Sequence, residues 1–269
     1  MNILILDSEV YVRFGFFFGI FTIMALWELT APRRLLSTSK VTRWFINITI
    51  TFLNSVALRL VFPLPATGIA LVASEKGWGL LNTFALDGLT AGLIAIVLLD
   101  LTIYLQHVLF HHLRILWRLH MIHHTDLDID VTTGARFHPI EIILSMIIKM
   151  AIVVLIGAPA WSVLVFEVVL NGMSMFNHSN VFIPGRIDGL LRKLIVTPDF
   201  HRVHHSILVH EHNRNFGFNL SVWDRIFGTY REQPGAGHQG MTIGLSDFRE
   251  ENRLTLPYIL TLPVIWKRR

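Results

Sequence analysis

The stretch His120-Met121-Ile122-His123-His124 reads HMIHH, and its histidine spacing returns later in the chain as His201-Arg202-Val203-His204-His205, HRVHH. In each copy the histidines stand at positions i, i+3 and i+4, which share one face of an α-helix. Imidazole is a ligand of zinc, copper, iron and nickel alike. The two copies therefore predict two helices that each offer three imidazoles to metal.

Further histidines precede and separate the two copies. Asp100, Tyr104, His107 and His111 are spaced 4, 3 and 4, so they share one helix face near the end of an apolar stretch. His178 stands alone just past another apolar stretch. Without a metal, so many clustered imidazoles would leave ring nitrogens without partners. We therefore predict a metal site, and we interpret the scattered histidines as ordinary core or interface residues: His112, His138, His210, His212 and His238.

The composition indicates a membrane protein. Of the 269 residues 52% are hydrophobic and only 16% are charged, against the usual quarter, and the mean hydropathy is +0.53. The net charge of +4 is too small to indicate nucleic-acid binding. The chain has no cysteine, which excludes disulfides, thiolate nucleophiles and cysteine-held metal sites. Any metal must be held by histidine or by oxygen ligands.

The apolar stretches predict an all-α, multi-pass membrane bundle of about four to five spans, each near the 20 residues that a bilayer needs. The short stretch 66–73 is too brief to cross and is a candidate re-entrant piece, and 254–266 is expected on the surface or packed against the body. We expect one integral-membrane domain, residues 1–269, with a histidine-rich cap. The predicted spans are 11–29, 44–62, 89–109, 140–156 and 161–175.

Basic residues predict the orientation of the bundle. The connection 32–43 carries four bases and no acid, 74–88 carries only Lys76, and Arg114 and Arg118 follow the third span. Because basic loops stay in the cytoplasm, the amino terminus should lie outside and the carboxyl terminus inside. On this orientation every histidine cluster is cytoplasmic.

The number of histidines bears on the number of metals. A structural zinc takes four ligands, so nine imidazoles are too many for one ion and about right for two. A pair of redox-active irons could activate dioxygen beside a lipid substrate, which zinc could not. Two alternatives stay open. A zinc-dependent membrane hydrolase would work without O2 or reductant, and a metal transporter or sensor would place ligands near the membrane midplane, often in repeated halves.

Over residues 95–232 the chain resembles the fatty acid hydroxylase superfamily, in its sterol desaturase branch. The segments that carry the resemblance are Asp100…His107-x-x-x-His111…Leu116-Trp117-x-x-His120-x-x-His123-His124, Arg136-x-His138-Pro139-x-Glu141, Asn177-His178-Ser179-Asn180, Thr197-Pro198-x-x-His201-x-x-His204-His205 and Asn215-Phe216-Gly217…Trp223-Asp224-Arg225-Ile226-Phe227-Gly228-Thr229-Tyr230.

The resemblance implies an integral-membrane, non-haem di-iron enzyme that uses O2 and two external electrons to hydroxylate or desaturate a lipid. Residues 95–232 would be its catalytic region. It implies two iron ions, which zinc can replace in purified protein because zinc binds more tightly. The implied metal ligands are His107, His111, His120, His123, His124, His178, His201, His204 and His205.

The chain departs from the family pattern at position 182, where Phe182 stands in place of the second histidine of an H-x-x-x-H box found in some members. Acids that accept a hydrogen bond from a ligating histidine tune such sites, and Asp100, Asp199 and Asp224 are the candidates for this catalytic support.

The sequence has no haem, flavin or ferredoxin segment, so electrons must come from a separate donor protein. A basic cytoplasmic surface could dock an acidic donor, or equally contact lipid headgroups. The bases that we assign to this surface are Arg114, Arg118, Arg202 and Arg214.

Lys149 and Glu167 each interrupt an otherwise apolar span. They stand symmetrically about the Gly157-Ala158-Pro159-Ala160 turn, so an antiparallel hairpin places both about 13 Å from it. A lone charge in a membrane interior costs about 2.5–3.5 kcal/mol on insertion scales. We therefore predict an ion pair between them. The alternative is that Lys149 reaches the interface and Glu167 is protonated in a polar cavity.

Overall fold

The computed structural model describes residues 2–84 and 86–266, and within them the regular structure is helical apart from three isolated bridges. Five helical stretches are long and apolar enough to cross a membrane, which confirms the predicted multi-pass bundle. The long helices are α1 (Asn2–Thr30), α2 (Lys40–Val61), α5 (Gly88–His112), α7 (Pro139–Ile156) and α8 (Ala160–His178).

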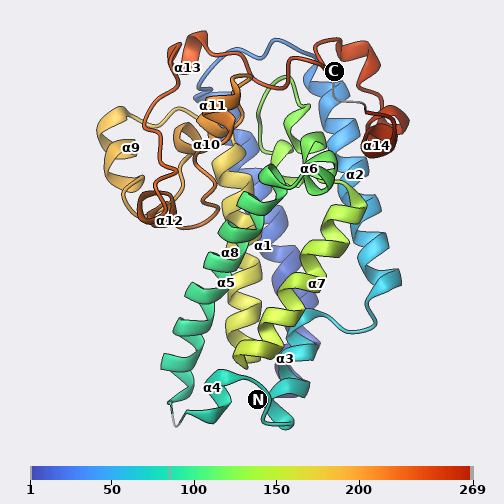
Figure 1. Ribbon diagram of the computed structural model, residues 1–269, viewed down its shortest axis with the longest axis vertical. Helices are drawn as coiled ribbons and strands as arrows, with labels where there is room; N and C mark the ends of the chain where they lie inside the picture. The colour runs from blue at the N-terminus through green and yellow to red at the C-terminus, as the bar shows by residue number, and fades with distance from the viewer. Residues whose placement is uncertain (1, 85, 267–269) are drawn as a thin grey trace.

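The short helices gather at the two ends of this bundle (Figure 1). At the end where α1 begins lie α3 (Ala66–Glu75), the short non-spanning piece that the sequence predicts, and α4 (Leu80–Thr83). The others form a cap at the opposite end. They are α6 (Arg114–His124), η1 (Thr133–Ala135), α9 (Gly185–Leu191), α10 (Pro198–His204), α11 (Val209–His212), α12 (Val222–Ile226), α13 (Gly237–Gly240), η2 (Glu251–Arg253) and α14 (Leu256–Ile265).

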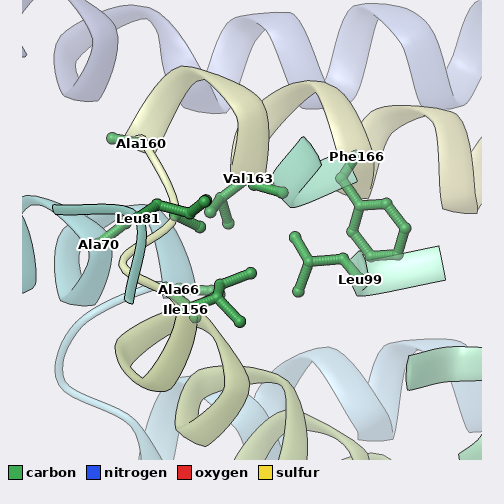
Figure 2. Close-up of a cluster of buried hydrophobic side chains, with 11 residues drawn as sticks. Ala66, Ala70, Leu81, Leu99, Ile156, Ala160, Val163 and Phe166 are labelled. Carbon is green, nitrogen blue, oxygen red and sulfur yellow. The ribbon is translucent and has the colours of Figure 1, made fainter. Parts of the chain in front are cut away.

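Helix packing away from the cap depends on small residues. Ala66, Ala70 and Ala160 are buried where α3 meets α7 and α8 (Figure 2), and small side chains let membrane helices approach closely. Gly157 ends α7 in the left-handed region, with φ 69°. The turn at Gly79 comes so close that an added Cβ there would lie 2.1 Å from the Gly157 nitrogen. A side chain at Gly79 would therefore separate α3–α4 from the α7–α8 turn.

Lys149 of α7 and Glu167 of α8 form the predicted ion pair. The structure adds a third member, because Arg13 of α1 donates to the other carboxylate oxygen of Glu167 at 2.5 Å. Arg13 also pairs with Glu9 of α1, whose second oxygen accepts a hydrogen bond from Thr67 of α3 at 2.6 Å. This balanced cluster links α1, α3, α7 and α8 by polar contacts within the bundle.

The cluster makes the two variants of the predicted pair unequal. We expect Glu167→Gln to destabilise by about 3–5 kcal/mol, because it leaves two cations without their shared carboxylate. Lys149→Met should cost less, because Glu167 keeps Arg13. The double variant should cost less than the sum of the single losses. Thermal unfolding in one detergent measures all three, and additive losses would contradict the pairing.

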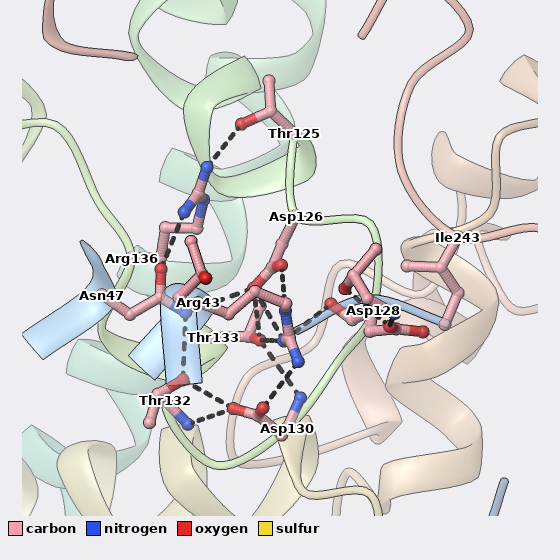
Figure 3. Close-up of polar contacts among 12 residues, drawn as sticks. Arg43, Asn47, Thr125, Asp126, Asp128, Asp130, Thr132, Thr133, Arg136 and Ile243 are labelled. Carbon is pink, nitrogen blue, oxygen red and sulfur yellow. Dashed lines mark hydrogen bonds and ion pairs between the residues drawn. The ribbon is translucent and has the colours of Figure 1, made fainter. Parts of the chain in front are cut away.

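A buried polar network fastens the cap to α2 (Figure 3). Arg43 in the first turn of α2 donates to Asp126 at 2.5 Å and to Asp130 at 2.7 Å, both in the loop that follows α6. Although burial raises the pKa of Asp126, the pairing with Arg43 lowers it to about 2. Arg136, from the same loop, donates to Asn47 of α2 at 2.7 Å. The loop between α6 and α7 is therefore held in one conformation beside the histidines that flank it.

The apolar carboxyl-terminal stretch packs against the body, one of the two placements that the sequence allows. α14 contacts α6, and Ile259 and Leu262 are buried in a cluster with Met121 and Ile122 of α6. This cluster covers the side of α6 that does not carry its histidines.

Candidate metal centre

Four helices, α5, α6, α8 and α10, bring the predicted histidines to one place at the cap end of the bundle, with His205 directly after α10. All are buried except His111, which is half-buried. The side chains fall into two groups whose ring nitrogens lie within 4.8 Å of one another in each group. The first group is His107, His111, His120, His124 and His204, and the second is His123, His178, His201 and His205.

In the first group, the Nε2 atoms of two histidine rings point their lone pairs toward each other. His107 Nδ1 lies 2.8 Å from the Phe216 carbonyl oxygen, which can only accept, so this nitrogen carries the proton. His120 Nδ1 lies 2.6 Å from Glu141 Oε1, and where this carboxyl is ionised it only accepts, so that His120 Nδ1 also carries its proton. The Nε2 atoms of the two rings are then both unprotonated, and they are 3.2 Å apart. Two lone pairs at that distance repel each other unless a cation lies between them.

The second group repeats this arrangement. His178 Nδ1 donates to the Ser174 carbonyl at 2.7 Å, and His123 Nδ1 donates to the Arg136 carbonyl at 3.3 Å. Their Nε2 atoms are 3.0 Å apart. Two imidazoles bound to one ion at about 2.0–2.1 Å have nitrogens about 3.0–3.4 Å apart, as the geometry of such bonds requires. Both groups therefore have the donor type and spacing to hold a metal ion.

Unpartnered ring nitrogens support the same conclusion. In the described part of the chain, His204 Nε2 and the Nδ1 atoms of His201 and His205 are buried without a hydrogen-bond partner. Burial, with a smaller contribution from neighbouring imidazoles, lowers the pKa of each of these rings well below 6.5. Burial also lowers the pKa of His120 to about 3. The rings are thus neutral near pH 7, the form that binds metal.

Comparison with known proteins agrees with this geometry. The fatty acid hydroxylase family model matches residues 92–229, just over half of the chain. The chain belongs to the fatty acid hydroxylase family. The match includes all nine clustered histidines. No solved structure matches the chain.

Curated relatives share the same region. The chain is 32% identical to the ornithine lipid hydroxylase OlsE of Rhizobium tropici over 141 residues, which is 52% of this chain and 42% of the relative. It is 27% identical to the alkylglycerol monooxygenase of Homo sapiens over 150 residues, 55% of this chain and 32% of the relative. The chain therefore aligns with less than half the length of these relatives.

Phe182, where the chain departs from the H-x-x-x-H box predicted for some family members, lies beyond the helix that carries His178. α8 ends at His178, and the chain continues in an extended conformation in which the Phe182 nitrogen donates to the Ala31 carbonyl at 2.8 Å. The Phe182 side chain is 47% exposed. Position 182 is therefore off the helix face that carries His178, and the second group has four histidines where the first has five.

Among the described residues, the acid that hydrogen-bonds a clustered histidine is Glu141 of α7, rather than one of the three predicted acids. Asp100 accepts hydrogen bonds from Trp223 Nε1 at 2.8 Å and from the Leu220 nitrogen at 3.3 Å. The sequence could have indicated Glu141, because a lone acid in the first turn of an apolar span needs a partner. Its place opposite His120 could not be read from spacing.

The other two predicted acids also have partners of their own. Asp224 accepts from the Phe216 and Gly217 nitrogens at 2.8 and 2.7 Å, so it fixes the peptide whose carbonyl orients His107. Asp199 pairs with Arg33 at 3.0 Å and with Arg202. Asp224 thus contacts the Phe216 peptide rather than a histidine ring. Asp199 pairs with arginines beside the histidine groups.

The structure corrects the predicted basic surface. Arg202 is fully buried against Asp199 and cannot contact a docking protein. Arg202 lies on α10, and the chain around Arg33 together with α13 covers this side of the helix. Arg114 and Arg214 remain exposed, while Arg118 is half-buried and donates to the Trp266 carbonyl.

The scattered histidines lie outside the two groups. His138 accepts from the Ile140 nitrogen at 3.1 Å and so caps α7. His212 is buried against Trp117, with ring centroids 5.6 Å apart. His210 and His112 are exposed, and His238 is buried near Asp199.

Proposed function

We propose that this protein is a membrane-bound, non-haem di-iron oxygenase that uses O2 and electrons from a separate donor protein to hydroxylate or desaturate a lipid. The observation that carries the proposal is the pair of adjacent histidine groups whose unprotonated nitrogens face each other at 3.0–3.2 Å. Family membership supports it, because relatives carry the names hydroxylase and monooxygenase.

One iron ion would be held by each group, five histidines for one and four for the other. When bound, the two ions would supply the activation of O2 and the electron transfer that oxidation of a lipid C–H bond requires. The protein's own part is to keep each ring neutral and oriented. The carbonyls of Phe216, Arg214 and Ser174 do this for three rings, each at 2.7–2.8 Å from an Nδ1 atom.

Carboxylate side chains complete the support of the histidine rings. Glu141 accepts from His120 Nδ1, and such a partner raises the basicity of the ligand and fixes its tautomer. We propose Asp224 as a positioning residue that acts on His107 through the Phe216 peptide. Asp100 would hold the chain around Trp223 against α5, and Asp199 would hold α10 through Arg202.

Location and substrate follow from the same features. The cap would lie in the cytoplasm, because the basic connection 32–43 is at the cap end of the bundle. Residues 95–232 would be the catalytic region of a single domain, 1–269. The substrate would be an amphipathic lipid, because relatives are named for an ornithine lipid and for alkylglycerol.

Metal analysis tests the proposal. We expect two metal ions per chain after full loading, with iron in protein made in iron-rich, zinc-poor medium. Zinc should displace iron when both are supplied, because zinc binds more tightly to the same ligands. Product formation in membranes should require both O2 and reductant. One ion per chain, or lipid conversion that continues without O2, would contradict the proposal, and the second result would favour a zinc hydrolase.

A further inference from the structure

Two short cap helices, α9 and α12, project sideways beside the upper part of α5 (Figure 1). Residues 182–194 and 222–228 are named here the lateral ledge. They lie outside the five candidate spans, yet they carry large exposed apolar side chains. Those more than half exposed are Ile187, Leu190, Leu194 and Ile226, at 53, 67, 61 and 65%.

The two parts of the ledge are joined by Arg225, which donates to the Arg192 carbonyl at 2.9 Å, and by Ser221, which directly precedes the second part. The Ser221 nitrogen donates to the Leu194 carbonyl at 3.0 Å, and Ser221 Oγ donates to the Arg192 carbonyl at 2.7 Å. Arg192 in turn pairs with Asp188 of α9. Asp188 and Arg192 of the ledge thus face inward, while its large apolar side chains face outward.

The ledge is also fixed to α5 below the level of the metal centre. Phe227 stacks on Tyr104 with ring centroids 5.3 Å apart, and Trp223 Nε1 donates to Asp100 at 2.8 Å. Tyr104 lies eight residues before the end of α5 at His112, about 12 Å along the axis. A segment held at that level of a membrane-crossing helix lies below the end of the span.

Basic side chains accompany the apolar ones. Arg186, Lys193 and Arg225 are exposed on the ledge. Among the described residues, Arg186 and Lys193 form no ion pair with an acid. Apolar side chains beside unpaired bases, with Trp223 at the junction to α5, are the composition of a segment lying in a membrane interface.

We propose that the lateral ledge is inserted into the leaflet on the cap side, with its apolar side chains among the upper acyl chains and its bases at anionic headgroups. The depth fixed by Asp100 and Tyr104 decides in favour of lipid over a soluble partner. The ledge would thus anchor the cap in the bilayer next to the metal centre.

The chain has no cysteine, so a single introduced cysteine gives a unique labelling site. We would attach a nitroxide to Ile226→Cys and, separately, to Leu190→Cys in the full chain, reconstituted in phosphatidylcholine–phosphatidylglycerol vesicles. The matched control is Val209→Cys on α11, which is 65% exposed like Ile226 but lies on the cap away from the spans. Power saturation then compares collisions with O2, which concentrates in lipid, and with a water-soluble nickel chelate.

We expect O2 to exceed the nickel chelate as a relaxant at positions 226 and 190, and the opposite order at 209. A nickel-accessible label at both ledge positions would overturn the proposal by placing the ledge in water. Labels at 226 and 190 that neither reagent reaches would overturn it in favour of a protein interface. The measurement needs no turnover, so its outcome is independent of the proposed enzymatic function.

Discussion

His204→Ala and His123→Ala are each expected to abolish turnover, with a loss greater than the 10–100-fold typical of changing a partner behind a ligand. His204 belongs to the group of five and His123 to the group of four. Each substitution removes one nitrogen donor and leaves a buried hole among neutral rings. Activity in membranes and metal content per chain are the two measurements.

The unequal groups predict unequal metal loss. His123→Ala leaves three donors in its group and should lower the metal content towards one ion per chain. His204→Ala leaves four donors, so it should retain more metal while still losing activity. His210→Ala is the control, because this exposed histidine belongs to neither group. It should keep most activity. A His204→Ala protein with normal turnover and metal content would refute the ligand assignment.

Arg43→Met is expected to lower the free energy of unfolding by about 3–5 kcal/mol, the range for breaking a buried ion pair. The substitution leaves the carboxylates of Asp126 and Asp130 buried without their cation. The same loop provides the Arg136 carbonyl that orients His123. We therefore expect metal loss from the group of four as well as a lower melting temperature in detergent.

Arg253→Met is the matched control for that prediction. Arg253 pairs with Glu250 at 2.7 Å, but its side chain is 70% exposed, and pairs of this kind contribute about 1 kcal/mol or less. Arg43→Lys should recover part of the lost stability, because it keeps the positive charge. A lysine cannot reproduce the contacts that the planar guanidinium makes with Asp126 and Asp130 together. Equal melting temperatures for Arg43→Met and Arg253→Met would show that the network does not hold the cap.

Local spacing predicted the features that depend on one helix. The i, i+3, i+4 pattern placed His120, His123 and His124 on one face, and the structure has them there on α6. Apolar length predicted the crossing helices. Symmetry about the α7–α8 turn even predicted the Lys149–Glu167 pair, because a hairpin relates positions along its two arms by simple counting.

Contacts between distant helices could not be read in the same way. The sequence did not indicate that Arg13 reaches Glu167 from 154 positions away, or that Glu141 faces His120. It placed Arg202 on an exposed basic surface, whereas the fold buries that side chain against Asp199. Each of these depends on the rotation of a helix about its axis, which periodicity within the helix leaves free.

The sequence by itself thus determined an all-helical membrane bundle and the histidines of a candidate metal centre, because hydropathy and helical period act over neighbouring residues. Only the tertiary structure decided that the histidines divide into groups of five and four, and that backbone carbonyls orient four of the nine rings. That division depends on how α5, α6, α8 and α10 meet, and their meeting is set by side-chain packing and buried polar pairs between segments far apart in the chain.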